Sequence, residues 1–246
     1  MLELKNISFS AAGDTGNKEI LKDISIKFDD GFIAITGPNG GGKSTLAKII
    51  AGIEKPDSGQ IILNGEDITA LSVTERAKKG ISFAFQQPVR FKGITVNDLI
   101  RLAAGKPISI SEACDYLSKV GLCARDYINR EVNASLSGGE LKRIEIATVL
   151  ARGTAVSIFD EPEAGIDLWS FSNLINVFER MRDKFGGSII IISHQERILN
   201  IADKVAVITA GKLTSYGEKA DVLPELLDAS FDACKVLTDN IEGAKV

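Results

Sequence analysis

The sequence predicts an α/β protein in which buried parallel strands alternate with helices. Three apolar segments rich in Val and Ile, at 155–159, 188–193 and 204–209, have the continuous character of strands covered on both faces. Segments with helical periodicity, 168–185 and 195–202, separate them. This alternation predicts a parallel sheet with right-handed crossover connections.

The N-terminal part has a different pattern, which predicts antiparallel strands. Residues 2–9 (LELKNISF) and 23–28 (DISIKF) alternate between apolar and polar side chains, as half-buried antiparallel strands do. Residues 59–67 (GQIILNGED) read as a strand followed by a turn, and residues 80–85 (GISFAF) as a further strand.

A helical insertion is predicted after these strands. Residues 95–105 (TVNDLIRLAAG) and 111–121 (SEACDYLSKVG) are amphipathic and begin with Thr or Ser, which are favoured helix caps. We therefore expect a helical subdomain over 88–152. Residues 1–87 and 153–246 would form the α/β core with its antiparallel β part.

Composition narrows the class of protein. The chain of 246 residues has a net charge of −4 and a pI of about 5.3, so we expect no nucleic-acid partner. Neither a signal peptide nor a run of about 20 apolar residues is evident. Three widely spaced cysteines, Cys114, Cys123 and Cys234, suggest a reducing compartment, and we expect a cytoplasmic protein. The favoured interpretation is that they are packed small side chains, and metal ligation is the alternative.

A glycine-rich segment at 37–45 (GPNGGGKST) matches the pattern G-x-x-x-x-G-K-[ST]. It follows an apolar strand and begins a helix, which is the context that a phosphate-binding loop requires. Glycine allows backbone N–H groups to approach phosphate oxygens, and the helix N-terminus favours an anion. Lys43 would reach the β- and γ-phosphates, and Ser44 would bind Mg²⁺. The predicted nucleotide-binding residues here are Gly37, Pro38, Asn39, Gly40, Gly41, Gly42, Lys43, Ser44 and Thr45.

Two adjacent carboxylates end the strand at 155–159. Burying such groups is costly unless a cation or a reaction uses them, so Asp160 is predicted to hold Mg²⁺ and Glu161 to polarise the attacking water. His194, the only histidine of the chain, follows another strand end and would sense the γ-phosphate. Alternative roles are a capped strand end for the carboxylates and a structural role for the histidine.

A second glycine-rich helix start occurs at 136–140 (LSGGE), before the helical segment 141–152. Ser137, Gly138 and Gly139 would form a second anion site at a helix N-terminus. A plain helix cap made by Ser137 and Glu140 is the alternative.

Together these motifs resemble the ATP-binding cassette (ABC) ATPases over nearly the whole chain. The segments at 37–45, 155–161 and 136–140 are similar to the Walker A, Walker B and signature motifs of that family. Gln86 resembles the Q-loop residue, Asp167 the D-loop residue and His194 the switch histidine.

The resemblance implies a RecA-like parallel-sheet core with an antiparallel β subdomain and a helical subdomain. It also implies ATP and Mg²⁺ as ligands, with Gln86 near the metal beside Ser44 and Asp160, and Lys43, Glu161 and His194 in catalysis. Two copies would form an ATP-dependent dimer, in which each ATP lies between one Walker A loop and the signature motif of the other copy. Residues of the second half-site would be Ser137, Gly138, Gly139, Glu140 and Asp167.

One position departs from the family pattern. The family often has an aromatic residue after the first strand to stack on adenine, and the matching place here is Ala11. Phe9 lies two residues earlier, on the same strand face. The base preference is therefore open.

Four stretches, 70–95, 136–147, 164–171 and 193–212, resemble the SufC subgroup, the cassette ATPases of iron–sulfur cluster assembly. This implies a SufB-like scaffold protein as partner, whereas Pro162 is the form common in transporters. The alternative is the ATP-binding subunit of a membrane ABC transporter. In either case Val89, Phe91 and Ile94 would form the docking surface, unless they belong to the core of the helical part. A DNA-repair or translation cassette fits poorly, because the chain has no second cassette and no basic stripe.

Overall fold

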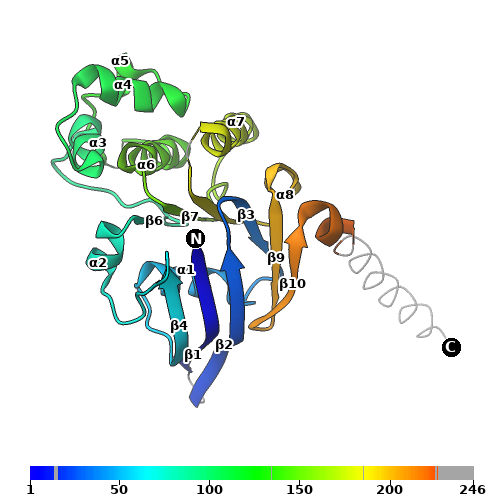
Figure 1. The fold of residues 1–246 in the computed structure, drawn as a ribbon. Coiled ribbons are helices and arrows are strands. Elements are labelled where there is room, and N and C mark those ends of the chain that lie inside the picture. Colours follow the sequence, from blue (N-terminus) through cyan, green and yellow to red (C-terminus); the bar gives the residue numbers. More distant parts are fainter. Residues whose placement is uncertain (14–15, 134, 185, 225, 227–246) are drawn as a thin grey trace.

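The computed structural model describes residues 1–13, 16–133, 135–184, 186–224 and 226, and it has two β-sheets and a helical layer (Figure 1). The predicted α/β class and the predicted arrangement of a parallel-sheet core with an antiparallel part are confirmed. Cys234 lies outside the described residues.

The larger sheet has six strands in the order β10-β9-β3-β8-β7-β6. Every neighbouring pair is parallel except β9 and β10. The strands are β3 (Gly31–Thr36), β6 (Ile81–Ala84), β7 (Val156–Asp160), β8 (Ser188–Ile192), β9 (Lys204–Thr209) and β10 (Lys212–Glu218). Strand β10, which a turn at Ala210 and Gly211 joins to β9, was not predicted from the sequence. Both turn residues have positive φ, as a two-residue hairpin turn requires.

The six-stranded sheet separates two hydrophobic cores. In β8, Ile189 and Ile191 pack into the core shared with the helices, and Ile190 and Ile192 pack into the core shared with the other sheet. This division follows from the two-residue period of a strand. It confirms the prediction that the apolar runs are strands covered on both faces.

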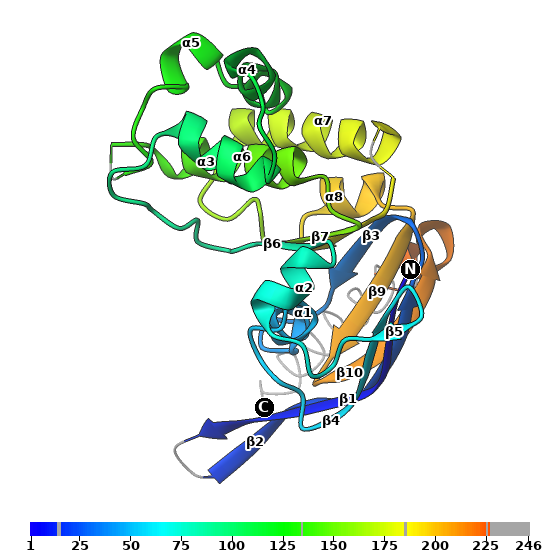
Figure 2. The ribbon, with the colours of Figure 1, turned by 60° about the vertical axis from the view of Figure 1, so that its left-hand side comes forward.

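The smaller sheet is antiparallel, with the strand order β2-β1-β4-β5. Its strands are β1 (Leu2–Gly13), β2 (Gly16–Phe28), β4 (Ser58–Leu63) and β5 (Glu66–Asp67). The first two form a long hairpin that extends beyond the rest of the sheet (Figure 2). Helix α1 (Lys43–Ala51) packs with residues of both sheets in the second core.

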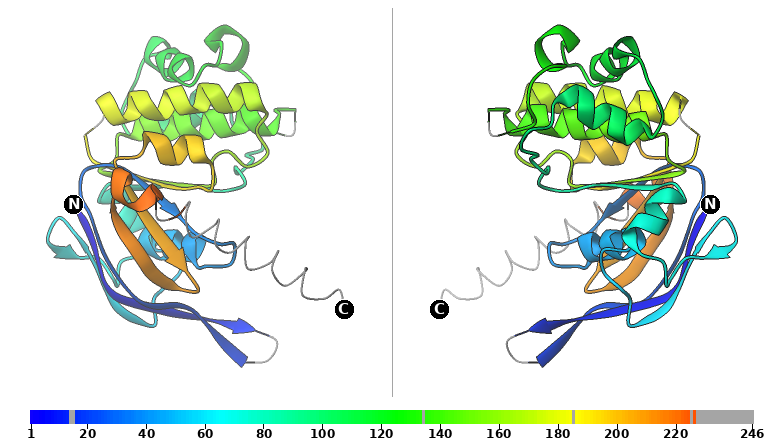
Figure 3. Two further views of the ribbon diagram at one scale, coloured as in Figure 1. Left: turned by 90° about the vertical axis from the view of Figure 1, so that its right-hand side faces the viewer. Right: turned by 90° about the vertical axis from the view of Figure 1, so that its left-hand side faces the viewer.

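Helices cover the other face of the six-stranded sheet (Figure 3). They are α3 (Val96–Ala104), α4 (Ile110–Lys119), α5 (Ala124–Tyr127), α6 (Gly138–Arg152), α7 (Leu168–Lys184) and α8 (Glu196–Ile201). Thr95 caps α3 as expected, whereas Ser109, two residues before the predicted start, caps α4. Helices α2 (Val73–Lys78) and α5 were not predicted, since six and four residues are too short to show a period. The division of the chain at 88 and 152 stays a proposal.

The remaining expectations concern cysteines and membranes. Leu117 and Val120 are buried, and Cys114 packs against the same core, as its helical spacing predicted. Cys123 is exposed. In the part of the chain that the structure describes, every helix is too short or too polar to cross a bilayer.

Candidate nucleotide site

The glycine-rich segment forms the loop between β3 and α1, and packing explains its composition. At Gly37, where φ is 130°, an added Cβ would lie 2.1 Å from the carbonyl oxygen of Ile208. At Gly42, where φ is 101°, it would lie 2.6 Å from a methyl carbon of Leu21. Any side chain at either position would therefore clash or strain the loop.

The loop lines a pocket of about 300 Å³. The lining residues are Lys18, Ile20, Asn39, Gly40, Gly41, Gly42, Lys43, Ser44, Thr45 and Glu161. Most were predicted as nucleotide-binding residues, but Lys18 and Ile20, which come from β2, were not. Their place depends on how the antiparallel sheet packs over the loop, and a local sequence pattern does not show that.

Lys43 points back over its own loop. Its ammonium donates to the carbonyl oxygens of Gly37, at 2.7 Å, and of Pro38, at 2.9 Å. Burial lowers the pKa of Lys43, whereas the nearby carboxylates of Glu161 and Asp160 act in the opposite direction. A buried cation thus lies at the start of α1, beside the backbone N–H groups of the helix N-terminus.

Two of the three residues predicted for the metal site, Ser44 and Asp160, are in contact, whereas the third, Gln86, contacts Glu161. The Ser44 hydroxyl donates to Oδ1 of Asp160 at 2.9 Å. Burial raises the pKa of Asp160, and the hydrogen bond from Ser44 opposes this. A hydroxyl and a carboxylate are hard oxygen ligands that suit Mg²⁺, which keeps several waters and takes phosphate oxygens as further ligands.

Glu161, Gln86 and His194 converge from three neighbouring strand ends. The Gln86 amide donates to Oε2 of Glu161 at 2.5 Å, and Nε2 of His194 lies 3.9 Å from Oε1. Burial and the charge of Lys43 lower the pKa of His194 below its usual value, against the opposing effect of Glu161. The shift favours the neutral imidazole. Glu161 has a φ of 44°, which is uncommon for a residue other than glycine.

The segment 137–140 lies at the N-terminus of α6 and does not line this pocket. Ser137 and Glu140 form a capping box there. The Ser137 N–H donates to the Glu140 carboxylate at 2.7 Å, and the Glu140 N–H to the Ser137 hydroxyl at 3.3 Å. Tyr127 also donates to Glu140. The carboxylate of Glu140 therefore caps α6, while Gly138 and Gly139 have no side chains that would cover the backbone N–H groups beside it.

Asp167 is likewise a helix cap. Its Oδ1 accepts the N–H groups of Trp169 and Ser170, both at 3.0 Å, at the start of α7. These bonds lower the pKa of Asp167. Asp167 is near the segment 137–140, because Gly139 faces Ser170, but it does not line the phosphate pocket.

Two ionisable side chains of α6, Lys142 and Glu145, hold the chain next to Gln86. Lys142 donates to the carbonyl oxygen of Phe85 at 2.5 Å, and the Phe85 N–H donates to Oε1 of Glu145 at 3.0 Å. Oε2 of Glu145 is buried without a partner, and burial raises the pKa of Glu145 to about 7. Lys142 and Glu145 are opposite charges three residues apart on α6, and this spacing is the sequence signal for the pair.

The predicted docking residues lie beside this pair. Val89 and Phe91 are 48% and 36% exposed, while Ile94 is half-buried. Both exposed residues line a groove of about 190 Å³ together with Phe85 and Glu145. Ile94 is not among the residues of that groove.

The comparisons with known proteins identify the family. The profile described as "ABC transporter" matches residues 21–164, more than half of the chain. An ABC transporter ATP-binding protein of Methanocaldococcus jannaschii is 41% identical over 84% of this chain and 86% of its own length. A probable ATP-dependent transporter, ycf16, of Trieres chinensis is 34% identical over 96% of this chain and 98% of its own length.

A solved structure shows the same fold. The ATP-binding cassette MJ0796, in a dimer bound to ADP and Pi, superposes with a TM-score of 0.80 at 22% identity, covering 89% of this chain and 99% of that one. The protein therefore belongs to the ABC transporter ATP-binding family, and it is an ATPase with the cassette fold.

Proposed function

We propose that the protein hydrolyses Mg²⁺-bound ATP at the interface of two copies arranged head to tail. One observation carries the proposal. The phosphate loop and Glu161 line one pocket, and two of its residues contact the other predicted groups, Ser44 with Asp160 and Glu161 with Gln86 and His194. The helix start at Ser137 does not line that pocket. A second copy would bring that helix start to the open side of the pocket.

The chain's residues have distinct tasks in this proposal. Lys43 leaves the carbonyl oxygens of Gly37 and Pro38 and binds the β- and γ-phosphates. Ser44 and Asp160, with Gln86 nearby, hold Mg²⁺, which offsets the phosphate charge. Glu161 orients the attacking water, and Gln86 fixes the rotamer of Glu161 through the hydrogen bond between them. Neutral His194 donates a hydrogen bond to the γ-phosphate.

The second copy contributes the other half of the site. The N–H groups at Gly138 and Gly139 and the Ser137 hydroxyl approach the γ-phosphate with the positive end of the α6 dipole. The contacts of Glu140 and Asp167 support a positioning role, since both carboxylates already accept backbone N–H groups of their own helices. A carboxylate placed against the phosphates would repel them.

The partner that uses this ATPase is, in our proposal, the membrane subunit of a transporter. The names of the relatives support it, and Pro162 agrees with it. The expectation of a SufB-like scaffold gains no support from those names. It remains the second candidate because of the SufC-like stretches at 70–95, 136–147, 164–171 and 193–212. In both cases the chain would work on the cytoplasmic side, through the groove at Val89 and Phe91.

A site-specific photo-crosslinker tests the partner. We would place it at Val89 in the native host, with Ile110 as the matched control, since Ile110 is 61% exposed on α4 and does not line the groove. An integral membrane protein captured only from position 89 is the expected product. A soluble iron-binding protein captured there would instead favour the scaffold, and equal capture from both positions would contradict docking at the groove.

A further inference from the structure

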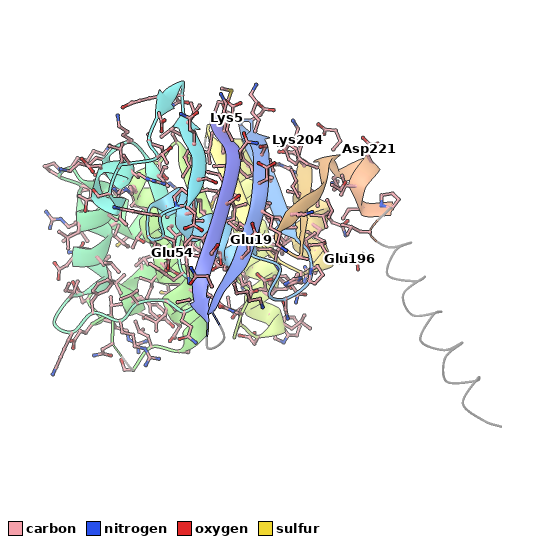
Figure 4. The ribbon with its side chains drawn as sticks, turned by 90° about the horizontal axis from the view of Figure 1, so that it is seen from below. Lys5, Glu19, Glu54, Glu196, Lys204 and Asp221 are labelled. Carbon is pink, nitrogen blue, oxygen red and sulfur yellow. The ribbon has the colours of Figure 1, made fainter. Side chains whose placement is uncertain are left out.

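Strand β2 crosses directly over the phosphate loop. A Cβ added at Gly42 would lie 2.6 Å from the Leu21 side chain and 3.0 Å from the carbonyl oxygen of Ile20. Figure 4 views the molecule from the side of the β1–β2 hairpin, on which Glu19 is labelled. The antiparallel sheet therefore supplies one wall of the phosphate pocket.

Lys18 belongs to that wall. It lies two residues before Ile20 on β2, so both side chains point to the same face of the strand. Both line the pocket, with the loop residues Asn39 and Gly40. Since a strand rises about 3.3 Å per residue, Lys18 lies about 7 Å beyond Ile20. The pocket thus has a cation at its outer end as well as Lys43 at its inner end.

The place where a stacking ring would be expected holds no ring. Ala11 pairs with Lys18 in the β1–β2 ladder, so the two side chains share a face. Phe9 pairs with Leu21 and packs against the core between the two sheets. Among the described residues that line the pocket, none is aromatic. Its lining offers the cations Lys18 and Lys43 and backbone N–H groups for phosphate. Its other polar side chains are Asn39, Ser44 and Thr45 of the loop and its helix start, and Glu161 after β7.

We propose that the site selects the triphosphate and not the base, and that Lys18 is a second cation that binds the phosphate chain. The inference rests on the proposed function, and it names the substrate class as Mg²⁺-bound nucleoside triphosphates, GTP as well as ATP. Lys18 contacts phosphate oxygens from the β2 side while Lys43 contacts them from the loop.

Calorimetric titration of the full chain in Mg²⁺ with ATP, GTP and inorganic tripolyphosphate tests the first part. The three dissociation constants are expected to agree within about fivefold, because the phosphate contacts are common to all. Binding of ATP more than about thirtyfold tighter than the other two would overturn the inference and leave the proposed function standing. Failure of all three to bind would overturn both.

One variant and a matched control test the second part. Lys18→Met is expected to weaken all three ligands alike, by about fivefold, the scale of a partly exposed charged hydrogen bond. Lys27→Met, at an exposed position of the same strand that does not line the pocket, should leave binding unchanged. Unchanged binding in Lys18→Met, or weaker binding of ATP alone, would contradict the role of Lys18.

A further substitution adds an aromatic ring at Ala11, where the family often has one. Ala11→Tyr places an aromatic face beside Lys18, and base stacking on such a face should tighten ATP and GTP by about tenfold. Tripolyphosphate has no base, so its affinity should not change. An equal gain for tripolyphosphate, or no gain for the nucleotides, would show that a bound nucleotide does not reach the Ala11–Lys18 pair, and would overturn the role proposed for Lys18.

Discussion

The phosphate loop at 37–45 and the helix start at 137–140 are both glycine-rich helix N-termini, yet they differ in how the helix is capped. Gly42 gives α1 no side-chain cap, and the space before that helix holds the Lys43 ammonium. Helix α6 is capped by its own Ser137 and Glu140. The N-terminus of α1 therefore lies in a pocket with a cation. The N-terminus of α6 is capped by its own side chains and lies outside that pocket.

This difference shows how the work is divided. A helix start that already has a capping box needs no ligand to be stable, so α6 can present Gly138 and Gly139 to another molecule. The N-terminus of α1 instead has no side-chain cap, and the carboxylates of Asp160 and Glu161 favour the charged form of Lys43 beside it. One terminus binds the phosphates, and the other is suited to complete the site from a second copy.

The largest effect is expected at the phosphate loop. Lys43→Ala removes the cation that would reach the β- and γ-phosphates, and ATP turnover should fall by at least about a hundredfold, as for the loss of one transition-state donor. Steady-state phosphate release measures it. Lys55→Ala, just beyond the same helix, is the control. Turnover near the native rate in Lys43→Ala would rule out this loop as the reaction site.

A similar loss of turnover, but with a dimer retained, is expected at Glu161. Glu161→Gln keeps an acceptor for Gln86 but not the carboxylate that orients water, so turnover should fall by about a hundredfold while ATP stays bound. Light scattering should then show a dimer that depends on ATP. Trp169, the only tryptophan of the chain, is 83% exposed and lies two residues after Asp167. Its fluorescence emission should shift to shorter wavelength when the dimer forms and covers it. A monomer with and without ATP would contradict the pairing.

The smallest effect is expected at Glu145, which bonds the backbone of Phe85, next to Gln86, from α6. Glu145 has a raised pKa of about 7, against about 4.3 when unfolded. Between these values the folded chain holds a proton that the unfolded chain has lost, so the free energy of unfolding should fall as pH rises from 5 to 7. Glu145→Gln cannot ionise, and its stability should exceed that of the native chain by on the order of 2 kcal/mol at pH 8.

Urea unfolding at pH 5, 6, 7 and 8 measures this effect, with Glu54→Gln as the control. Parallel pH profiles for the native chain and Glu145→Gln would show that Glu145 does not keep its proton in the fold. The same result would also weaken the inference that Lys142 and Glu145 hold the backbone of Phe85 in place.

The features that could be predicted from the sequence are those that depend on residues close together in the chain. The strand–loop–helix at 32–52 and the carboxylates that end β7 follow from local spacing, and the structure places them as expected. The structure also shows that the carboxylate of Glu140 caps its own helix, one of the two readings that local spacing left open. Lys18 enters the pocket only because a hairpin distant in sequence packs on the loop. Likewise, Glu145 gains its role from contact with Phe85, 60 residues away in the chain.

The central claim is that each site joins the phosphate loop of one copy to the α6 start of another. Gly139→Asp tests the second half without disturbing the fold, because an added Cβ would lie 3.8 Å from Ser170 and an acidic residue suits the first turn of a helix. Its charge would repel the γ-phosphate, so this variant and Lys43→Ala should each be inactive. Mixed in equal amounts, they should recover about a quarter of the native ATPase activity, because half of the dimers contain both variants and each of these has one intact site. A mixture no more active than the sum of the two separate variants would contradict the account.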